Sequence, residues 1–304
     1  MTVDWKGVFP AVTTKFKADL SLDGDEMRRC VQAQVDAGVD GLICCGSLGE
    51  ASTLDLDEKV AVVALALEVA GGRIPVLATV AEATTARACA FAKKAEEIGA
   101  DGFMILPGMQ YVSDGREAVA HYQAVAASVS KPLMIYNNPV AYRVDLGEEE
   151  IATLIEDPKF VAIKESSDDV RRTTTLRNRF GARLKIFGGV DNLALEGLLM
   201  GADGWVAGLV CAFPRETVAI YRLVRAGRLD EARTLYRWFV PLLELDVSTK
   251  LVQNIKLAEA LACGSTETVR PPRLPLVGAE RARVEAIIQT ALACRPALPD
   301  LDSL

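Results

Sequence analysis

Several features common in enzyme active sites are scarce in this sequence of 304 residues. Histidine occurs once, as His121, which excludes zinc sites built on several histidines and leaves a single candidate for a Ser-His-Asp triad. No CxxC, GxGxxG or GxxxxGK[ST] pattern occurs, so the sequence has no fingerprint of a redox dithiol, a dinucleotide site or a nucleotide-phosphate site. We therefore expect His121 to be structural.

Positive charge and long apolar runs are also lacking. The net charge is −7 and no run of five basic residues occurs, which argues against nucleic acid or an anionic membrane as a partner. No apolar run reaches the roughly 18 residues of a membrane span, and residues 1–6 do not resemble a signal peptide. The seven cysteines, an odd number, indicate small buried side chains of a reduced, cytoplasmic protein.

The sequence does contain eight short apolar runs bounded by turn residues, which we predict to be strands. They are Val8–Thr13, Gly41–Cys45, Val76–Thr79, Gly102–Leu106, Leu133–Asn137, Val161–Lys164, Lys185–Phe187 and Gly204–Ala207. Helical patterns with apolar residues three and four apart lie between them, most clearly at Glu58–Val69 and Ala86–Ile98. This alternation predicts an α/β fold.

A repeated joint supports that prediction. The form Gly-x-Asp-Gly occurs at residues 38–41, 99–102 and 201–204, each time between a helical pattern and a strand. Its first glycine suits the left-handed position that ends a helix. The eight predicted strands, each followed by a helix, predict a (β/α)₈ TIM barrel, with a doubly wound parallel sheet as the alternative.

The pattern changes in the last third of the chain. Pro214–Ala226, Leu229–Leu245, Leu251–Ala262 and Ala279–Ala293 are predicted to be helices with no strand between them. We therefore expect a catalytic barrel over residues 1–225 and a helical block, residues 226–304, packed against it.

Candidate site residues follow from the barrel, because its active site lies at the carboxyl ends of the strands. Lys164 and Tyr136 end adjacent predicted strands, whereas Lys185 begins its strand and should face the opposite rim. A partly desolvated lysine becomes a nucleophile, although many lysines at strand ends only extend to water. Gly189, at the end of the seventh strand, leaves room for backbone N–H groups to approach an anion. No carboxylates with metal spacing occur at these ends, so we expect no metal.

Three segments at these strand ends resemble the signature segments of the dihydrodipicolinate synthase / N-acetylneuraminate lyase family. They are Gly46-Ser47-Leu48-Gly49-Glu50, Tyr136-Asn137-Asn138-Pro139 and Val161-Ala162-Ile163-Lys164-Glu165. The segments Gly189-Val190-Asp191 and Gly201-Ala202-Asp203-Gly204-Trp205-Val206 are similar too, and the resemblance continues in order over roughly residues 5 to 260.

The resemblance implies a barrel enzyme, usually a homotetramer, that needs no cofactor and binds a 2-oxo acid as an imine on a lysine. By position, Lys164 would be the nucleophile and Tyr136 the acid/base. Ser47 and the backbone N–H of Leu48 would hold the substrate carboxylate, with Ser47 also within hydrogen-bond reach of Tyr136. The carbonyl of Val206 would face the bound substrate.

The sequence departs from the synthase members of that family at three places. Leu48 replaces a threonine, and Ala141 stands where an arginine would hold a second carboxylate, with Arg143 two residues further on. The paired tyrosines after the fourth strand are also absent, although Tyr111 lies nearby. These changes make the expected mouth, near Leu48, Met109 and Ala141, more apolar than synthesis of dihydrodipicolinate would require.

We therefore expect a Schiff-base lyase that cleaves, dehydrates or deaminates a small hydroxylated 2-oxo acid or its cyclic imine. The resemblance of Leu48 and Asn138-Pro139 to hydroxyproline-degrading members favours 1-pyrroline-4-hydroxy-2-carboxylate deaminase. The alternatives are a pyruvate-dependent aldolase acting on a 4-hydroxy- or 2-keto-3-deoxy acid, 4-hydroxy-tetrahydrodipicolinate synthase, and a non-catalytic protein that binds a 2-oxo acid.

Overall fold

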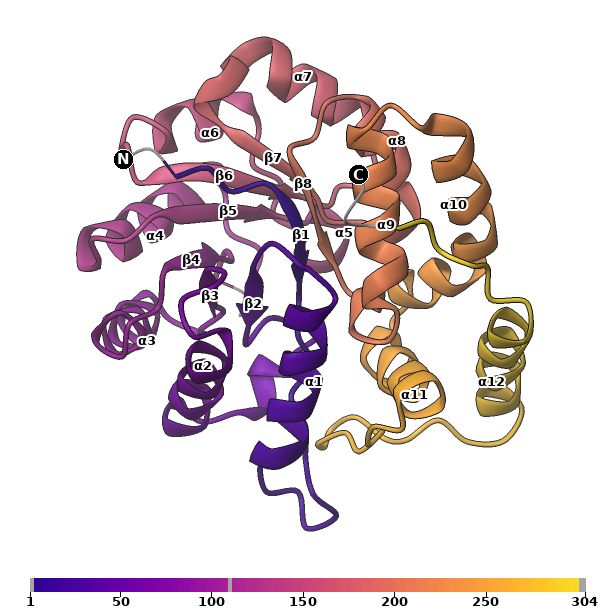
Figure 1. The fold of residues 1–304 in the computed structure, drawn as a ribbon. Coiled ribbons are helices and arrows are strands. Elements are labelled where there is room, and N and C mark those ends of the chain that lie inside the picture. The colour runs from indigo at the N-terminus through magenta and orange to yellow at the C-terminus, as the bar shows by residue number, and fades with distance from the viewer. Residues whose placement is uncertain (1–2, 109–110, 301–304) are drawn as a thin grey trace.

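The computed structural model describes residues 3–108 and 111–300 and shows a barrel of eight parallel strands surrounded by helices (Figure 1). The strands are β1 (Gly7–Pro10), β2 (Leu42–Cys44), β3 (Val76–Val80), β4 (Gly102–Ile105), β5 (Leu133–Asn137), β6 (Phe160–Glu165), β7 (Lys185–Gly188) and β8 (Gly204–Ala207). They are hydrogen-bonded in the order β1-β8-β7-β6-β5-β4-β3-β2, and a bridge between Ala11 and Ile43 closes the barrel. The predicted fold and all eight predicted strands are confirmed.

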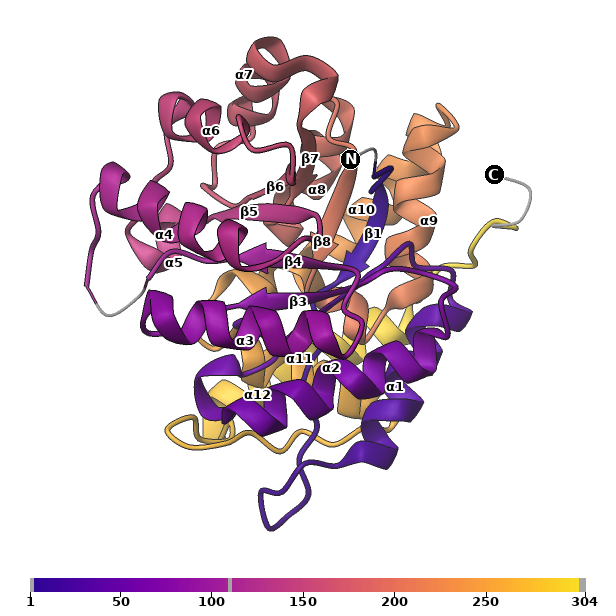
Figure 2. The same ribbon diagram turned by 90° about the vertical axis from the view of Figure 1, so that its left-hand side faces the viewer.

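Helices follow the strands and cover the outside of the barrel, as the view in Figure 2 shows for α1 to α4. The α-helices are α1 (Gly24–Asp36), α2 (Leu56–Ala70), α3 (Thr85–Glu97), α4 (Gly115–Ser128), α5 (Pro139–Tyr142), α6 (Glu148–Leu154), α7 (Arg171–Phe180), α8 (Ala194–Leu199), α9 (Pro214–Arg225), α10 (Leu229–Leu243), α11 (Leu251–Cys263) and α12 (Gly278–Ala293). Short 3₁₀ turns are η1 (Ala51–Thr53), η2 (Gly181–Arg183), η3 (Asp191–Leu193), η4 (Leu209–Cys211) and η5 (Glu244–Val247).

The repeated Gly-x-Asp-Gly joint aligns helices with strands. Its first glycines, Gly38, Gly99 and Gly201, have φ angles of +83°, +101° and +97°, a conformation that side chains with a Cβ rarely adopt. Each aspartate accepts a hydrogen bond from a backbone N–H of the preceding strand and returns one from its own N–H. The pairs are Asp40 with Val8, Asp101 with Val76 and Asp203 with Ile186. The joint therefore connects each new strand to its neighbour at the amino-terminal rim.

Large and small residues alternate inside the barrel. The rings of Phe9 on β1 and Phe187 on β7 lie edge to face, with their centroids 5.1 Å apart. A methyl group at Gly204 would lie 2.4 Å from the Phe187 ring, and one at Gly41 would lie 2.3 Å from the Phe9 ring. These two positions therefore require glycine, and the interior is a packed core rather than a channel.

The helices after β8 gather on one side of the barrel in Figure 1, where α10, α11 and α12 are coloured orange to yellow. Helix α10 packs on α9, and the Trp238 indole N–H on α10 donates to the Ala291 carbonyl on α12 at 3.1 Å. The four helices predicted for this part of the chain are confirmed. The division of the chain at residue 225 stays a prediction.

Two further predictions from the sequence concern cysteine and histidine. All seven cysteines are free, and the prediction that they are buried is confirmed for Cys44, Cys45 and Cys211. Cys30 and Cys89 are only half-buried, and Cys263 and Cys294 are exposed, so the prediction is wrong for the last two. They lie near the ends of α11 and α12, where the helices meet solvent. His121 lies on α4, outside the barrel, and its Nδ1 is hydrogen-bonded to the Thr85 hydroxyl at 2.9 Å.

None of the described helices is both long enough and apolar enough to cross a membrane.

Candidate active site

The two residues on which the predicted chemistry depends lie side by side at the carboxyl ends of their strands. Tyr136 on β5 is in register with Lys164 on β6, and both side chains are about nine-tenths buried. The Lys164 amine lies 4.2 Å from the centre of the Tyr136 ring. Lys185, by contrast, pairs with Asp203 and Asp4 at the amino-terminal rim, as expected for a residue that begins its strand.

The Lys164 amine is buried without a directly paired carboxylate. No described carboxylate lies within ion-pair distance of it in residues 3–108 and 111–300. Burial lowers the pKa of Lys164 from its ordinary value of 10.5, an effect that the more distant charges of Asp246 and Asp191 oppose. A larger fraction of the amine is therefore neutral and nucleophilic than in a lysine exposed to water.

Gly189 provides the space that Lys164 occupies. A methyl group at this position would lie 2.1 Å from the Ser166 hydroxyl and 2.6 Å from Cε of Lys164. A methyl group added to the neighbouring Gly188 would have no atom within 4 Å. Gly189 therefore has a steric reason to be glycine, besides the predicted contact between its backbone and a substrate anion, which stays a prediction.

Ser47 lies in the site, but its hydrogen-bond partner differs from the predicted one. Its hydroxyl bonds to the hydroxyl of Tyr142, whereas the hydroxyl of Tyr136 accepts a hydrogen bond from the Asn138 side chain at 3.1 Å. The Tyr142 and Tyr136 rings lie edge to face with centroids 5.6 Å apart. The expected contact between Ser47 and Tyr136 is thus replaced by a contact through Tyr142, which sequence reasoning missed.

The turn after β5 explains how Tyr142 reaches this place. Asn138 caps α5 by accepting a hydrogen bond from the Ala141 N–H at 2.9 Å, and Pro139 occupies the first turn. This single helical turn ends at Arg143, which has a left-handed φ of +62°. The Asn-Pro sequence was the available signal, because it begins a turn that carries Tyr142 back over β5.

Leu48 and Val206 are both buried at this end of the barrel. Leu48 is 4% exposed and follows Ser47, and Val206 on β8 is paired in register with Phe9 on β1. Burial of Leu48 agrees with an apolar wall where the synthase members have a threonine. The predicted contacts of Leu48 and Val206 with a substrate stay predictions.

Two carboxylates near Lys164 were given no role in the sequence analysis: Asp191, which was named only as part of a resembling segment, and Asp246, which was missed. Asp191 is fully buried in η3 and accepts hydrogen bonds from the Trp205 indole at 2.9 Å and from the backbone N–H of Leu209 at 2.8 Å. Burial raises the pKa of Asp191, and these hydrogen bonds oppose the shift. Asp191 therefore fixes the loop after β8 and contributes negative charge behind Lys164.

Asp246 is the second of these carboxylates and lies in η5, between α10 and α11. Its side chain lies directly over Gly208, where an added methyl group would be 2.3 Å from its Oδ1. Burial and the Asp191 charge raise the pKa of Asp246 well above its ordinary value, against the influence of Lys164. Asp246 is thus a second carboxyl group, besides Asp191, whose charge acts on Lys164.

Two other residues considered from the sequence, Tyr111 and Arg143, are exposed, Tyr111 to 66%. Within residues 3–108 and 111–300, the side chain of neither is hydrogen-bonded or ion-paired with the site residues described above. Met109 lies outside the described residues. Among the described residues, no group of three His, Cys, Asp or Glu side chains is arranged to hold a metal ion.

Comparison with known proteins gives a consistent result over almost the whole chain. The profile of the Dihydrodipicolinate synthetase family matches residues 4–291. A 4-hydroxy-tetrahydrodipicolinate synthase from Sorangium cellulosum is 36% identical over 289 residues, which cover 93% of this chain and 94% of the relative.

Two solved structures are similar in fold. A dihydrodipicolinate synthase from Bacillus anthracis has a TM-score of 0.91 at 26% identity, over 95% of this chain and 99% of that chain. A prophage protein of the dihydrodipicolinic acid synthase family from E. coli K12, solved in complex with pyruvate, has a TM-score of 0.89 at 27% identity, over 95% and 99% of the two chains. The chain belongs to the dihydrodipicolinate synthetase family.

Proposed function

We propose that this protein is a Schiff-base lyase that acts on a small hydroxylated 2-oxo acid or its cyclic imine through Lys164. The observation that carries the proposal is the buried amine of Lys164, which has no directly paired carboxylate and lies 4.2 Å from the centre of the Tyr136 ring. The complex of a family member with pyruvate supports a 2-oxo acid as the ligand class.

In the proposed reaction, the lone pair of the Lys164 amine attacks the carbonyl carbon of the 2-oxo acid. The carbonyl oxygen leaves as water and a protonated imine remains. This imine accepts the electron pair released when a bond at a neighbouring carbon breaks. The electron pair returns when a proton or a carbon electrophile is added, and water then releases the product and the amine.

Tyr136 and Tyr142 suit the proton transfers that these steps require. Burial raises the pKa of both hydroxyls, so each stays protonated near neutral pH and can donate before it accepts. The hydrogen bond between Tyr142 and Ser47 extends the set of hydroxyls toward the predicted carboxylate site. We propose that Tyr136 transfers protons at the imine carbon and that Ser47 and the Leu48 N–H hold the substrate carboxylate.

The departures from the synthase members bear on the reaction. Ala141 cannot hold a second carboxylate, and Leu48 removes one hydroxyl from the carboxylate site. We therefore favour deamination of 1-pyrroline-4-hydroxy-2-carboxylate or aldol cleavage of a 4-hydroxy-2-oxo acid. Synthesis of 4-hydroxy-tetrahydrodipicolinate is the second candidate, because relatives at 30–36% identity carry that name.

The test is a borohydride reduction followed by mass spectrometry. Incubation with pyruvate or a pyrroline carboxylate should give a mass adduct that is absent in Lys164→Ala. Pyrroline carboxylates and 4-hydroxy-2-oxo acids should then be assayed for ammonia and pyruvate release. Ammonia would identify a deaminase and pyruvate an aldolase. Absence of any adduct in the wild-type protein would contradict the proposal and favour a non-catalytic role.

A further inference from the structure

The carboxylate of Asp246 has no partner to account for its position. It makes no hydrogen bond or ion pair with any residue in the described parts of the chain, and its side chain is only half-buried. The other buried carboxylates at this end of the barrel are bonded: Asp191 to three N–H groups and Glu165 to the Ser167 N–H and the Asn137 side chain. Asp246 is therefore available to bind something outside the chain.

Its position is between Lys164 and the predicted carboxylate site around the barrel mouth, since β8 is two strands from β6 on one side and two strands from β2 on the other. Asp246 lies over Gly208 at the carboxyl end of β8, while Ser47 follows β2. Its contact with Gly208 places it at the mouth where the imine would form, and its charge acts on both Lys164 and Tyr136. Because the Tyr136 ring on β5 lies on the other side of Lys164, a ligand attached to Lys164 with its carboxylate toward Ser47 would direct its distal carbons toward the side of Asp246.

The turn that carries Asp246 is held in place independently of any ligand. The side chain of Asn254 on α11 donates to the carbonyl of Leu245 at 2.9 Å and to the hydroxyl of Ser248 at 3.0 Å. These bonds fix the residues on either side of Asp246. The carboxylate is thus preorganised, which lowers the entropic cost of binding a ligand group.

We propose that Asp246 selects substrates by accepting a hydrogen bond from a hydroxyl group on their distal carbons and by repelling a second carboxylate. The inference rests on the proposed imine at Lys164 and specifies its substrate class: a 2-oxo acid with one carboxylate and a distal hydroxyl. The positive charge of the protonated imine favours the ionised form of Asp246, in which it accepts hydrogen bonds most strongly. Ala141 agrees with this class, because it provides no cation for a second carboxylate.

The test compares three 2-oxo acids of five carbons that differ at the distal end: 4-hydroxy-2-oxopentanoate, 2-oxopentanoate and 2-oxoglutarate. For each, the concentration that gives half-maximal borohydride-trapped adduct is measured in the wild-type protein and in Asp246→Asn. The adduct mass separates the intact hydroxy acid from pyruvate formed by its cleavage. The 2-oxopentanoate value reports any effect of the substitution that is common to all imines.

Relative to 2-oxopentanoate, the substitution should raise the half-maximal concentration of the hydroxy acid by about tenfold, because a charge-assisted hydrogen bond is lost. It should lower that of 2-oxoglutarate by about threefold or more, because a like charge is removed. The methyl group of Gly208→Ala would displace Oδ1 of Asp246, so this variant should also raise the half-maximal concentration of the hydroxy acid. Glu244→Gln, an exposed change in the same turn, is the matched control and should alter none of the three values.

Equal shifts for all three acids in Asp246→Asn would overturn the inference, because a structural role or a role as counter-ion to the imine acts on every ligand alike. Unchanged values would overturn it as well. In both cases the wild-type adduct leaves the proposed imine function intact. A wild-type protein that forms no adduct with any of the acids would overturn the proposed function and the inference together.

Discussion

Buried lysines occur in two different settings at the same end of this barrel. Lys164 has no directly paired carboxylate, whereas Lys15, after β1, lies 2.6 Å from Glu259 on α11 and Lys256 on α11 is paired with Glu50 after β2. The Lys15 and Lys256 side chains are fully buried, and the Lys164 residue is 7% exposed. The difference between these lysines therefore lies in their partners rather than in how far they are removed from water.

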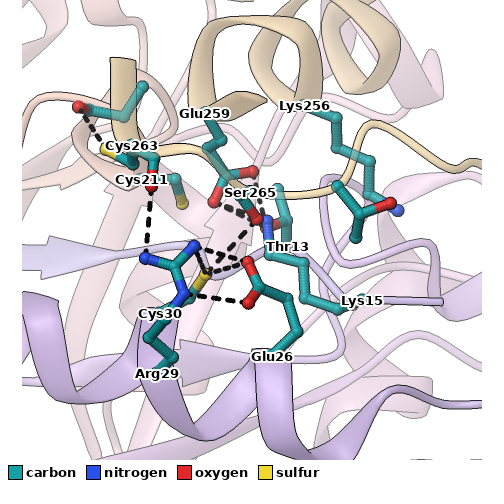
Figure 3. Close-up of polar contacts among 12 residues, drawn as sticks. Thr13, Lys15, Glu26, Arg29, Cys30, Cys211, Lys256, Glu259, Cys263 and Ser265 are labelled. Carbon is teal, nitrogen blue, oxygen red and sulfur yellow. Dashed lines mark hydrogen bonds and ion pairs between the residues drawn. The ribbon is translucent and has the colours of Figure 1, made fainter. Parts of the chain in front are cut away.

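The paired lysines join the C-terminal helices to the barrel. Figure 3 shows Lys15 and Thr13 pointing toward Glu259, and Lys256 projecting from the same helix. Thr13 donates to Glu259 at 2.9 Å, and Lys256 also donates to the Thr268 carbonyl at 2.7 Å. Because Glu50 lies three residues after Ser47, one of these ion pairs supports the loop that carries a candidate site residue.

The comparison shows how a partner changes the chemistry of a buried amine. Burial is the largest single effect on Lys15 and lowers its pKa, but the charge and hydrogen bond of the Glu259 carboxylate, together with Cys30 and Cys211, reverse it, and the pKa is raised. For Lys256, burial outweighs Glu50 and lowers the pKa to about 8. For Lys164, burial prevails over carboxylates that are not in direct contact. The pKa is thus lowered in a paired lysine as well as in Lys164, and what distinguishes Lys164 is that no ion pair in the described residues engages its amine.

The largest expected effect comes from Lys164→Met, which keeps the length of the side chain and removes the amine. We expect the borohydride adduct and turnover to fall to the detection limit, because Lys164 is the lysine that lies over the Tyr136 ring among the residues that the structure describes. The free energy of unfolding should change by less than about 1 kcal/mol, since no directly paired charge is left behind. Mass spectrometry and denaturant unfolding measure the two effects. Retained turnover would show that the chemistry lies elsewhere.

Replacement of Lys15 by methionine, in contrast, should lower the free energy of unfolding strongly. Lys15→Met leaves Glu259 buried without its cation, which should cost about 3–5 kcal/mol of unfolding free energy, measured in denaturant. The double variant Lys15→Met with Glu259→Gln is the control, because the amide is uncharged and can still accept from Thr13. It should recover part of the loss, and a double variant as unstable as the single one would contradict an electrostatic cause.

The surroundings of the unpaired lysine, Lys164, could be predicted in part from the sequence. The apolar run 161–163 ends in Lys164, and Tyr136 ends the strand before it, so both could be placed at one rim once eight strands had been counted. Ser47 and Gly189 followed from the same reasoning. These residues are close in space because they end strands of one barrel, which is a regular geometry that the hydrophobic pattern specifies.

The residues that could not be predicted lie outside that regular geometry. Asp246 belongs to a turn between helices, and no local pattern shows that this turn lies over Gly208. Tyr142 depends on the direction of a single helical turn after Pro139. Glu259 and Lys15 are 244 positions apart in the sequence, and their contact depends on how α11 packs against the barrel. Such contacts result from tertiary packing, which single-sequence patterns do not encode.

Gly189→Ala should disturb the unpaired lysine without changing any charge. The methyl group would lie 2.6 Å from Cε of Lys164, so the amine must move, and a displacement of about 1 Å can reduce turnover about 100-fold. Gly188→Ala is the matched control, because its methyl group would meet open space. Steady-state kinetics with the identified substrate measures both variants. Equal effects of the two substitutions would mean that backbone flexibility, rather than the position of the amine, is responsible.

The smallest expected effect is a change in the pH dependence of imine formation. The carboxylates of Asp246 and Asp191 and the hydroxyl of Tyr142 oppose the effect of burial on Lys164, so Asp246→Asn should lower the pKa of the Lys164 amine further. A lower pKa means more neutral amine below it, and the pH profile of the initial rate of borohydride-trapped 2-oxopentanoate should move to lower pH, by about one unit or less. Glu244→Gln, in the same turn but exposed, should leave the profile in place. A shift to higher pH in Asp246→Asn would mean that the distant carboxylates do not hold a proton on Lys164.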